Sequence, residues 1–206
     1  MKDLFFRNNP LYLITDTSIS GFTHAQIVKK AISAGVRTIQ LRDKQMSKRE
    51  LYDQALRVRN LTLQHKVTFI MNDYIDIAMA VRADGVHLGQ DDMPIEEARR
   101  IVGKKMIIGI STHNLGQAIK AQNQGADYIG FGPMFQTSTK EAGRPKGLRS
   151  LRNICSKINI PVVAIGGISS ENIRDVMDVG ADACAVISVI QSGDIRANIK
   201  RMMRAL

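Results

Sequence analysis

The sequence predicts a single α/β domain over residues 1–206, folded as a closed (β/α)8 barrel. Eight short, largely apolar runs rich in β-branched residues alternate with eight longer amphipathic segments. Nearly continuous apolar runs are typical of parallel strands that helices cover on the outside. The 206 residues divided among eight units give about 26 residues per unit, which lies within the range of this fold.

The expected strands are the runs at 11–15, 38–41, 67–71, 85–88, 106–110, 128–131, 162–165 and 183–187. The expected helices lie between and after them, near 23–34, 47–64, 74–81, 94–102, 114–124, 147–157, 170–178 and 193–204. Three of these helices carry start signals. Ser47 and Glu50 have capping-box spacing, Pro94 stands at a first-turn position, and Ser170 precedes Glu171.

A small-residue turn precedes every second strand, which supports closure of the barrel. The four copies are Ala34-Gly35-Val36, Ala83-Asp84-Gly85, Gly125-Ala126-Asp127 and Gly180-Ala181-Asp182. Their alanines are about two units apart, and in a barrel alternate strands supply the interior layers. An open, doubly wound sheet is the structural alternative, but the chain lacks the glycine-rich first turn of that fold.

The charge of the chain is strongly positive, with 29 Lys and Arg against 19 Asp and Glu. The basic residues are spread over helix-like segments, where solvated helix faces explain them. With no Trp and 5% aromatic residues, there is little for nucleic-acid bases to stack on. We therefore expect small anionic substrates and no nucleic acid, and an RNA-binding role is a distant alternative that rests on charge alone.

Composition and cysteine usage indicate a reduced, cytoplasmic protein. The longest apolar runs are far shorter than the roughly 20 residues of a membrane span, and the N-terminus shows no signal-peptide pattern. Cys155 and Cys184 have neither metal-ligand spacing nor the number for a disulfide scaffold. Assembly as a homo-oligomer is left open, because no pattern reports the oligomeric state.

Polar residues gather where the strands end. The clusters are 40–44, 72–73, 89–92, 111–113, 132–140, 166–169 and 187–188. The C-terminal ends of barrel strands meet at one mouth, which carries the chemistry of this fold. We therefore expect these clusters to share one site.

A phosphate site is expected at the last two strands. Gly166 and Gly167 allow close approach of the backbone to an anion, and amide groups near Ser188 precede a helix. A tight turn without a ligand is the alternative for the two glycines.

A metal site is the next candidate, because Asp73 and Asp92 end neighbouring strands. Two carboxylates without a Cys or His cluster suit Mg²⁺, which also takes phosphate oxygens and water. Helix capping, or pairing with Arg42 and Lys44, is the alternative. Together with Lys140, these two cations could stabilise a departing diphosphate.

The four histidines form no catalytic set. We expect His24 and His65 to be solvated and His87 to be a core histidine more than a functional one. His113 at a strand end could form a hydrogen bond with a substrate, or it could act at the start of the following helix. No Ser/His/Asp or Cys/His pair is visible, which argues against hydrolytic acyl chemistry.

With these residues laid out, the chain resembles the thiamine phosphate synthase (thiamine-phosphate pyrophosphorylase) family, from Tyr12 to about Ser188. The matching segments are Tyr12-Leu13-Ile14-Thr15-Asp16, Gln40-Leu41-Arg42-Asp43-Lys44, Asn72-Asp73-Tyr74-Ile75-Asp76-Ile77-Ala78, Ala83 to Asp92, Gly109 to His113, Gly130-Phe131-Gly132-Pro133, Thr137-Ser138-Thr139-Lys140, and Ala164 to Ile168. The family joins 4-amino-2-methyl-5-hydroxymethylpyrimidine diphosphate to a thiazole phosphate with Mg²⁺, releasing diphosphate and forming thiamine phosphate.

The resemblance also implies roles for individual residues. The pyrimidine diphosphate would be held by Gln40, Arg42, Lys44, Asn72, Ser111 and Lys140, of which Lys140, Ser111 and Arg42 would be catalytic. The thiazole phosphate would be held by Thr137, Thr139, Gly167, Ile187 and Ser188, and the metal by Asp73 and Asp92. In the family the thiazole nitrogen attacks with a free lone pair, and the aminopyrimidine stabilises positive charge in a dissociative substitution.

Two other enzyme classes are alternatives. A thiazole tautomerase is a related barrel that has no need of a metal-diphosphate site, whereas the residues for such a site are present here. A sugar-phosphate isomerase or epimerase would use the same phosphate loops and is more distant.

Overall fold

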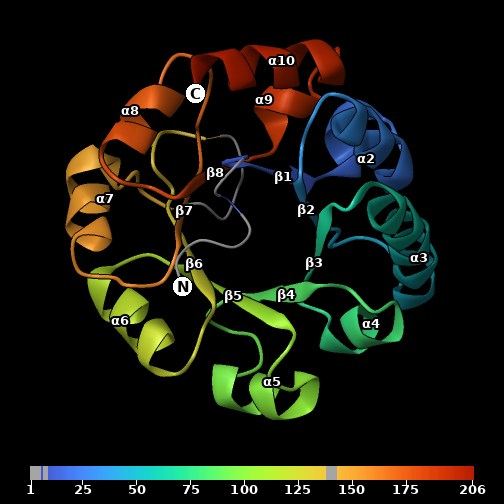
Figure 1. Ribbon diagram of the computed structural model, residues 1–206, viewed down its shortest axis with the longest axis horizontal. Coiled ribbons are helices and arrows are strands. Elements are labelled where there is room, and N and C mark those ends of the chain that lie inside the picture. The colour runs from blue at the N-terminus through green and yellow to red at the C-terminus, as the bar shows by residue number, and fades with distance from the viewer. Residues whose placement is uncertain (1–5, 7–8, 138–142) are drawn as a thin grey trace.

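The computed structural model describes residues 6, 9–137 and 143–206, and these form the predicted closed barrel (Figure 1). Every strand pairs in parallel with its neighbour in the chain, and β1 pairs with β8 to close the ring. The strands are β1 (Leu11–Thr15), β2 (Thr38–Leu41), β3 (Thr68–Asn72), β4 (Gly85–Leu88), β5 (Ile107–Thr112), β6 (Tyr128–Phe131), β7 (Val162–Ile165) and β8 (Ala183–Val186). The fold prediction is confirmed.

Helices surround the barrel on the outside, as Figure 1 shows. They are α1 (Thr17–Ser20), α2 (His24–Ser33), α3 (Lys48–His65), α4 (Ile75–Ala80), α5 (Ile95–Val102), α6 (Leu115–Asn123), α7 (Gly147–Cys155), α8 (Ile173–Asp178), α9 (Ser188–Gln191) and α10 (Ile195–Ala205). The short helices α1 and α9 were not predicted, because four residues are too few to show a helical period.

The predicted start signals fare differently. Ser47 caps α3 in a complete capping box with Glu50. Pro94 is the N-cap residue of α5 and precedes its first turn. The prediction at Ser170 is wrong, since α8 begins at Ile173. There the side chain of Asn172 accepts from the backbone of Ser169, so a turn occupies the expected first helical residues.

The repeated turn before the even strands stabilises the lower end of the barrel, where the strands begin. Asp84, Asp127 and Asp182 each accept a 2.8 Å hydrogen bond from the backbone amide of the first or second residue of the preceding strand. Arg59 pairs with Asp84 and Arg99 with Asp127. These aspartates therefore satisfy strand-end amides that would otherwise lie buried without a partner.

Two apolar layers make up the core. The outer layer lies between strands and helices, and the inner layer fills the barrel around Phe6, Tyr12, Ile70, Tyr128 and Val163. Within the inner layer, the Tyr128 ring lies directly against Gly109 of the neighbouring strand. Side chains of the described residues thus fill this part of the barrel interior, as is usual for the fold.

No helix in the described part of the chain has both the length and the apolar character that a membrane crossing needs. Cys155 is half-buried and Cys184 is buried, and the two form no disulfide with each other.

Candidate active site

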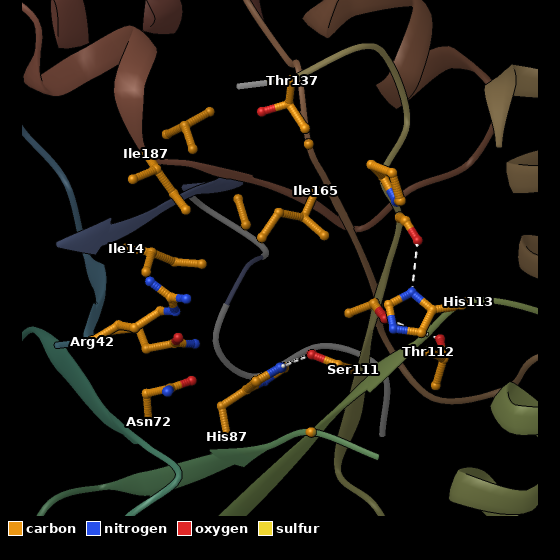
Figure 2. Close-up of a pocket in the computed structure, with 18 of the residues that line it drawn as sticks. Ile14, Arg42, Asn72, His87, Ser111, Thr112, His113, Thr137, Ile165 and Ile187 are labelled. Atoms are coloured by element: carbon orange, nitrogen blue, oxygen red, sulfur yellow. Dashed lines mark hydrogen bonds between the residues drawn. The ribbon is translucent and has the colours of Figure 1, made fainter. Parts of the chain in front are cut away.

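A cavity of about 580 Å³ opens at the C-terminal ends of the strands, and all eight strands or the loops that follow them contribute to it. Figure 2 shows polar groups such as Arg42, Asn72 and Ser111 on its wall, with apolar Ile14, Ile165 and Ile187 beside them. The predicted site residues found in its lining are Gln40, Arg42, Lys44, Asn72, Asp73, Asp92, Ser111, Thr137, Gly167, Ile187 and Ser188. Thr139 and Lys140 lie outside the described residues.

The carboxyl groups of Asp73 and Asp92 meet at the rim of this cavity. Desolvation, together with the nearby carboxylate of Asp92, raises the pKa of Asp73 above its usual range. Neither carboxylate caps a helix, since Tyr74 and Pro94 are the N-cap residues of α4 and α5. The capping alternative is therefore wrong, although Asp92 also accepts from the Gly89 amide at 2.7 Å.

Asp73 has an unusual backbone for a residue that is not glycine, with φ of 60°. Left-handed backbone at such a residue is uncommon and is often found at functional sites. It directs the chain from β3 into the rim while the Asp73 amide donates to the His87 carbonyl at 2.9 Å.

Positive charge lies close to this pair of carboxylates. Lys44 and Arg42 both act on Asp73 electrostatically, lowering its pKa against the larger effects of burial and of Asp92. Nη1 of Arg42 also lies 4.0 Å from Oδ2 of Asp16. The upper mouth therefore combines carboxylates for a cation with cations for an anion, within one cavity.

The loop that carries Arg42 and Lys44 is anchored by the residue between them. Asp43 accepts from the amides of Gln45 and Met46, from Thr17 Oγ1 at 3.0 Å and from His24 Nε2 at 3.2 Å. His24 is fully buried, so the expectation that it is solvated is wrong. Burial lowers the pKa of His24, an effect that Asp43 only partly offsets. His65, in contrast, is exposed as predicted.

The predicted phosphate site lies in the same cavity, where β7 and β8 end. Gly166 and Gly167 have positive φ, and Ser188 begins α9. A Cβ atom at Gly166 would lie 2.7 Å from Cβ of Pro133, and one at Gly167 would lie 2.5 Å from the Gln136 carbonyl. The two glycines are thus required by the loop that crosses them, so packing explains them whether or not an anion binds.

Both cavity histidines are hydrogen-bonded. His113 Nδ1 lies 3.0 Å from the Gly132 carbonyl, and its amide donates to Gln117. His87 lies 2.9 Å from Tyr128 Oη through Nδ1 and 2.9 Å from Ser111 Oγ through Nε2, the latter drawn in Figure 2. Desolvation lowers the pKa of His87 to about 4, which keeps the imidazole neutral near pH 7. His87 is therefore a half-buried histidine with both ring nitrogens hydrogen-bonded, and it lines the cavity.

The hydrogen-bonded tyrosines below the cavity were missed from the sequence. Tyr12 Oη lies 3.0 Å from Tyr128 Oη and accepts from Gln40 Nε2 at 2.8 Å. A tyrosine in a buried strand needs a partner for its hydroxyl, and this was the available signal. The partners themselves could not be predicted, because 116 residues separate the two tyrosines.

Comparison with known proteins agrees with this geometry. The family model for thiamine monophosphate synthase matches residues 11–190. The chain is 46% identical over 198 residues to the thiamine-phosphate synthase of Chloroflexus aurantiacus, covering 95% of this chain and 91% of that one. It is 48% identical over 189 residues to the protein of the same name from Clostridium novyi, covering 91% and 93%.

A solved structure gives the same answer. The thiamine phosphate pyrophosphorylase of Pyrococcus furiosus superimposes with a TM-score of 0.88 at 39% identity, covering 95% of this chain and 94% of that one. Since the family model spans most of the sequence and these relatives match nearly end to end, the chain belongs to the thiamine monophosphate synthase family, a family of transferases in thiamine biosynthesis.

Proposed function

We propose that this protein couples 4-amino-2-methyl-5-hydroxymethylpyrimidine diphosphate with a thiazole phosphate, releasing diphosphate and forming thiamine phosphate, with Mg²⁺. Membership of the family and the full-length relatives support the reaction. The observation that carries the assignment to this site is the single cavity, which brings together paired carboxylates, two cations and the glycine turn after β7.

The residues present fit a magnesium ion. Asp73 and Asp92 offer two hard oxygen ligands so close together that the charge of one raises the pKa of the other. Within residues 6, 9–137 and 143–206, no group of three or more His, Cys, Asp or Glu side chains could hold a metal. Substrate phosphate oxygens and water would complete the shell, as is usual for Mg²⁺. When bound, the ion would neutralise charge on the diphosphate.

The chain's own cations would stabilise the leaving group. Arg42 and Lys44 line the cavity beside the carboxylates, and the anchored Asp43 between them holds their loop. In the proposal they bind the diphosphate together with Ser111, Asn72 and Lys140. As the bond to the pyrimidine methylene breaks, negative charge grows on the diphosphate, and fixed positive groups stabilise that charge most.

The thiazole phosphate would occupy the side of the cavity formed by the ends of β6, β7 and β8. Gly167, Ser188 and Thr137 line it there, and Ile187 adds an apolar surface. Thr139 completes this set in the proposal. Placing both substrates in one cavity brings the thiazole nitrogen close to the methylene. The two substrates then react within one complex and need not collide in solution.

Two further properties belong to the proposal. A reducing compartment such as the cytoplasm agrees with two cysteines that form no disulfide with each other. Assembly into a homo-oligomer would place no demand on the cavity, since one chain supplies every site residue assigned above.

The experiment is incubation of the purified protein with both substrates, with and without Mg²⁺, followed by mass detection of the product. We expect thiamine phosphate and diphosphate in equal amounts, formed only with Mg²⁺. Absence of product with both substrates and Mg²⁺ present would contradict the proposal.

A further inference from the structure

A continuous chain of hydrogen bonds crosses the barrel at the floor of the cavity, and three of its members, Gln40, His87 and Ser111, line that cavity. It runs from Gln40 on β2 through Tyr12, Tyr128 and His87 to Ser111 on β5. We call these five side chains the relay. Tyr12 and Tyr128 are each 1% exposed and Gln40 is 2% exposed, so water does not supply alternative partners to this part of it.

The direction of every bond in the relay follows from its first member. Gln40 Nε2 donates to Tyr12 Oη at 2.8 Å, and the remaining polar neighbour of that hydroxyl is Tyr128 Oη at 3.0 Å. Tyr12 therefore donates to Tyr128. A buried hydroxyl that pointed its hydrogen elsewhere would lose its hydrogen bond. This loss would lower the folding equilibrium constant by roughly tenfold or more.

The same reasoning assigns the hydrogens of Tyr128, His87 and Ser111. Tyr128 has its own hydrogen left for Nδ1 of His87, 2.9 Å away. An imidazole that accepts at Nδ1 carries its hydrogen at Nε2, and it donates from there to Ser111 Oγ at 2.9 Å. The hydroxyl hydrogen of Ser111 is then left for the cavity that this residue lines.

The two ends of the relay consequently present opposite hydrogen-bonding groups to the cavity, an acceptor at one end and a donor at the other. With its nitrogen turned to Tyr12, Gln40 has its amide oxygen, an acceptor, left for the cavity, whereas Ser111 has a donor. Turning the amide of Gln40 around would reverse every bond, and Ser111 would then face the cavity as an acceptor. The relay thus couples the character of one end to that of the other.

We propose that Tyr12, Tyr128 and His87 are positioning residues that set both ends of the substrate site through this coupling. In this inference, which rests on the proposed function, Gln40 accepts from the amino group of the pyrimidine and Ser111 donates to its diphosphate. An amino group offers N–H donors and an ionised diphosphate offers only acceptors, so one direction of the relay satisfies both and the reverse satisfies neither.

The relay therefore selects an amino pyrimidine against an oxo pyrimidine. A 4-oxo analogue presents an acceptor where the amino group presents a donor. To accommodate it, Gln40 would have to turn around, and Ser111 would then lose its donor toward the diphosphate. Discrimination between the two compounds should depend on the hydroxyls of Tyr12 and Tyr128, two residues that do not line the cavity.

The test compares kcat/KM for the 4-amino substrate and its 4-oxo analogue, each with thiazole phosphate and Mg²⁺. Tyr128→Phe keeps the ring and removes the central hydroxyl, which frees the amide of Gln40 to turn. We expect the amino-to-oxo ratio to fall roughly ten- to hundredfold in this variant. Tyr52→Phe on α3, a residue that does not line the cavity, is the matched control and should keep the wild-type ratio.

Two kinetic results would overturn the inference: a wild-type protein that does not discriminate, or an unchanged ratio in Tyr128→Phe. If the wild-type protein makes no product from the 4-amino substrate, the proposed function has failed, and the relay is judged by a second measurement.

That second measurement is the tautomer of His87, read from ¹⁵N chemical shifts near pH 7 and assigned with His87→Gln. We expect hydrogen on Nε2 and none on Nδ1 in the wild-type protein, and a changed tautomer population in Tyr128→Phe. Hydrogen on Nδ1 in the wild-type protein would overturn the relay whatever the enzyme catalyses.

Discussion

A single methyl group added at Gly109 should damage both the stability and the catalysis of this protein. Gly109 on β5 pairs in register with Tyr128 on β6, and a Cβ atom at this position would overlap the tyrosine ring and hydroxyl. Tyr128 is 1% exposed and packs against Phe6 and Tyr12, so its ring cannot turn away into solvent. Overpacking of this kind typically destabilises a core by 1–3 kcal/mol.

We expect Gly109→Ala to lie in the upper part of that range, at about 2–3 kcal/mol, because the overlap is with a rigid ring inside the barrel. For a chain of 206 residues, this corresponds to a melting temperature lower by roughly 4–12 °C. Urea unfolding followed by circular dichroism measures the loss, and a parallel assay should show lower kcat/KM because the relay is displaced.

The control is Gly116→Ala on α6, where an added methyl meets only the Asn114 side chain at 3.3 Å. Its effect should stay within about 1 kcal/mol in either direction. In a double-mutant cycle, Tyr128→Ala should destabilise the Gly109→Ala protein less than it destabilises the wild type, since the overlap is already removed. Wild-type stability of Gly109→Ala, or additive effects in the cycle, would refute the packing described.

Three further predictions concern separate parts of the molecule. Lys140→Ala should lower kcat about 10²- to 10³-fold, and Asp92→Ala should chiefly lower turnover. The circular dichroism of both variants should be unchanged. Unaltered turnover in a folded variant would contradict the roles proposed. Asp127→Ala at the lower end of the barrel removes the acceptor of the Ile108 amide, so the free energy of unfolding should fall by about 1–3 kcal/mol while kcat/KM stays the same. Because the native pKa of His24 is lowered, the unfolded chain binds more protons below its ordinary pKa of 6.5, and stability should fall as the pH drops through that value. Urea midpoints between pH 7.5 and 5.5 measure this slope, which should be shallower in His24→Gln; an equal slope would show that other groups cause it.

Much of the barrel could be predicted because local patterns determine it. Apolar runs between helical periods located all eight strands to within one or two residues, and Ser47 with Glu50 marked the start of α3. Short helices and turns were less predictable. At α8, Ser170 looks like a helix start, but the Asn172 side chain bonds backward to Ser169 and delays the helix.

The positions of the site residues could also be predicted, since the strand ends of a barrel meet at one mouth. Their partners could not. His24 follows Thr23 at a helix start that looks solvated, yet its ring is buried against Thr15 and Asp43. The link from Tyr12 to Tyr128 depends on how strands on different sides of the barrel face each other across its interior. Such contacts are set by the closed barrel and leave only a weak signal in the sequence.

The most direct measurement of the central claim is a crystal structure with Mn²⁺ in place of Mg²⁺, together with diphosphate and the thiazole phosphate. We predict an anomalous peak in contact with the carboxylates of Asp73 and Asp92, diphosphate beside Arg42, and the second phosphate at the backbone of residues 166–167 and 187–188. A metal peak away from the two carboxylates, or a phosphate outside the shared cavity, would contradict the account.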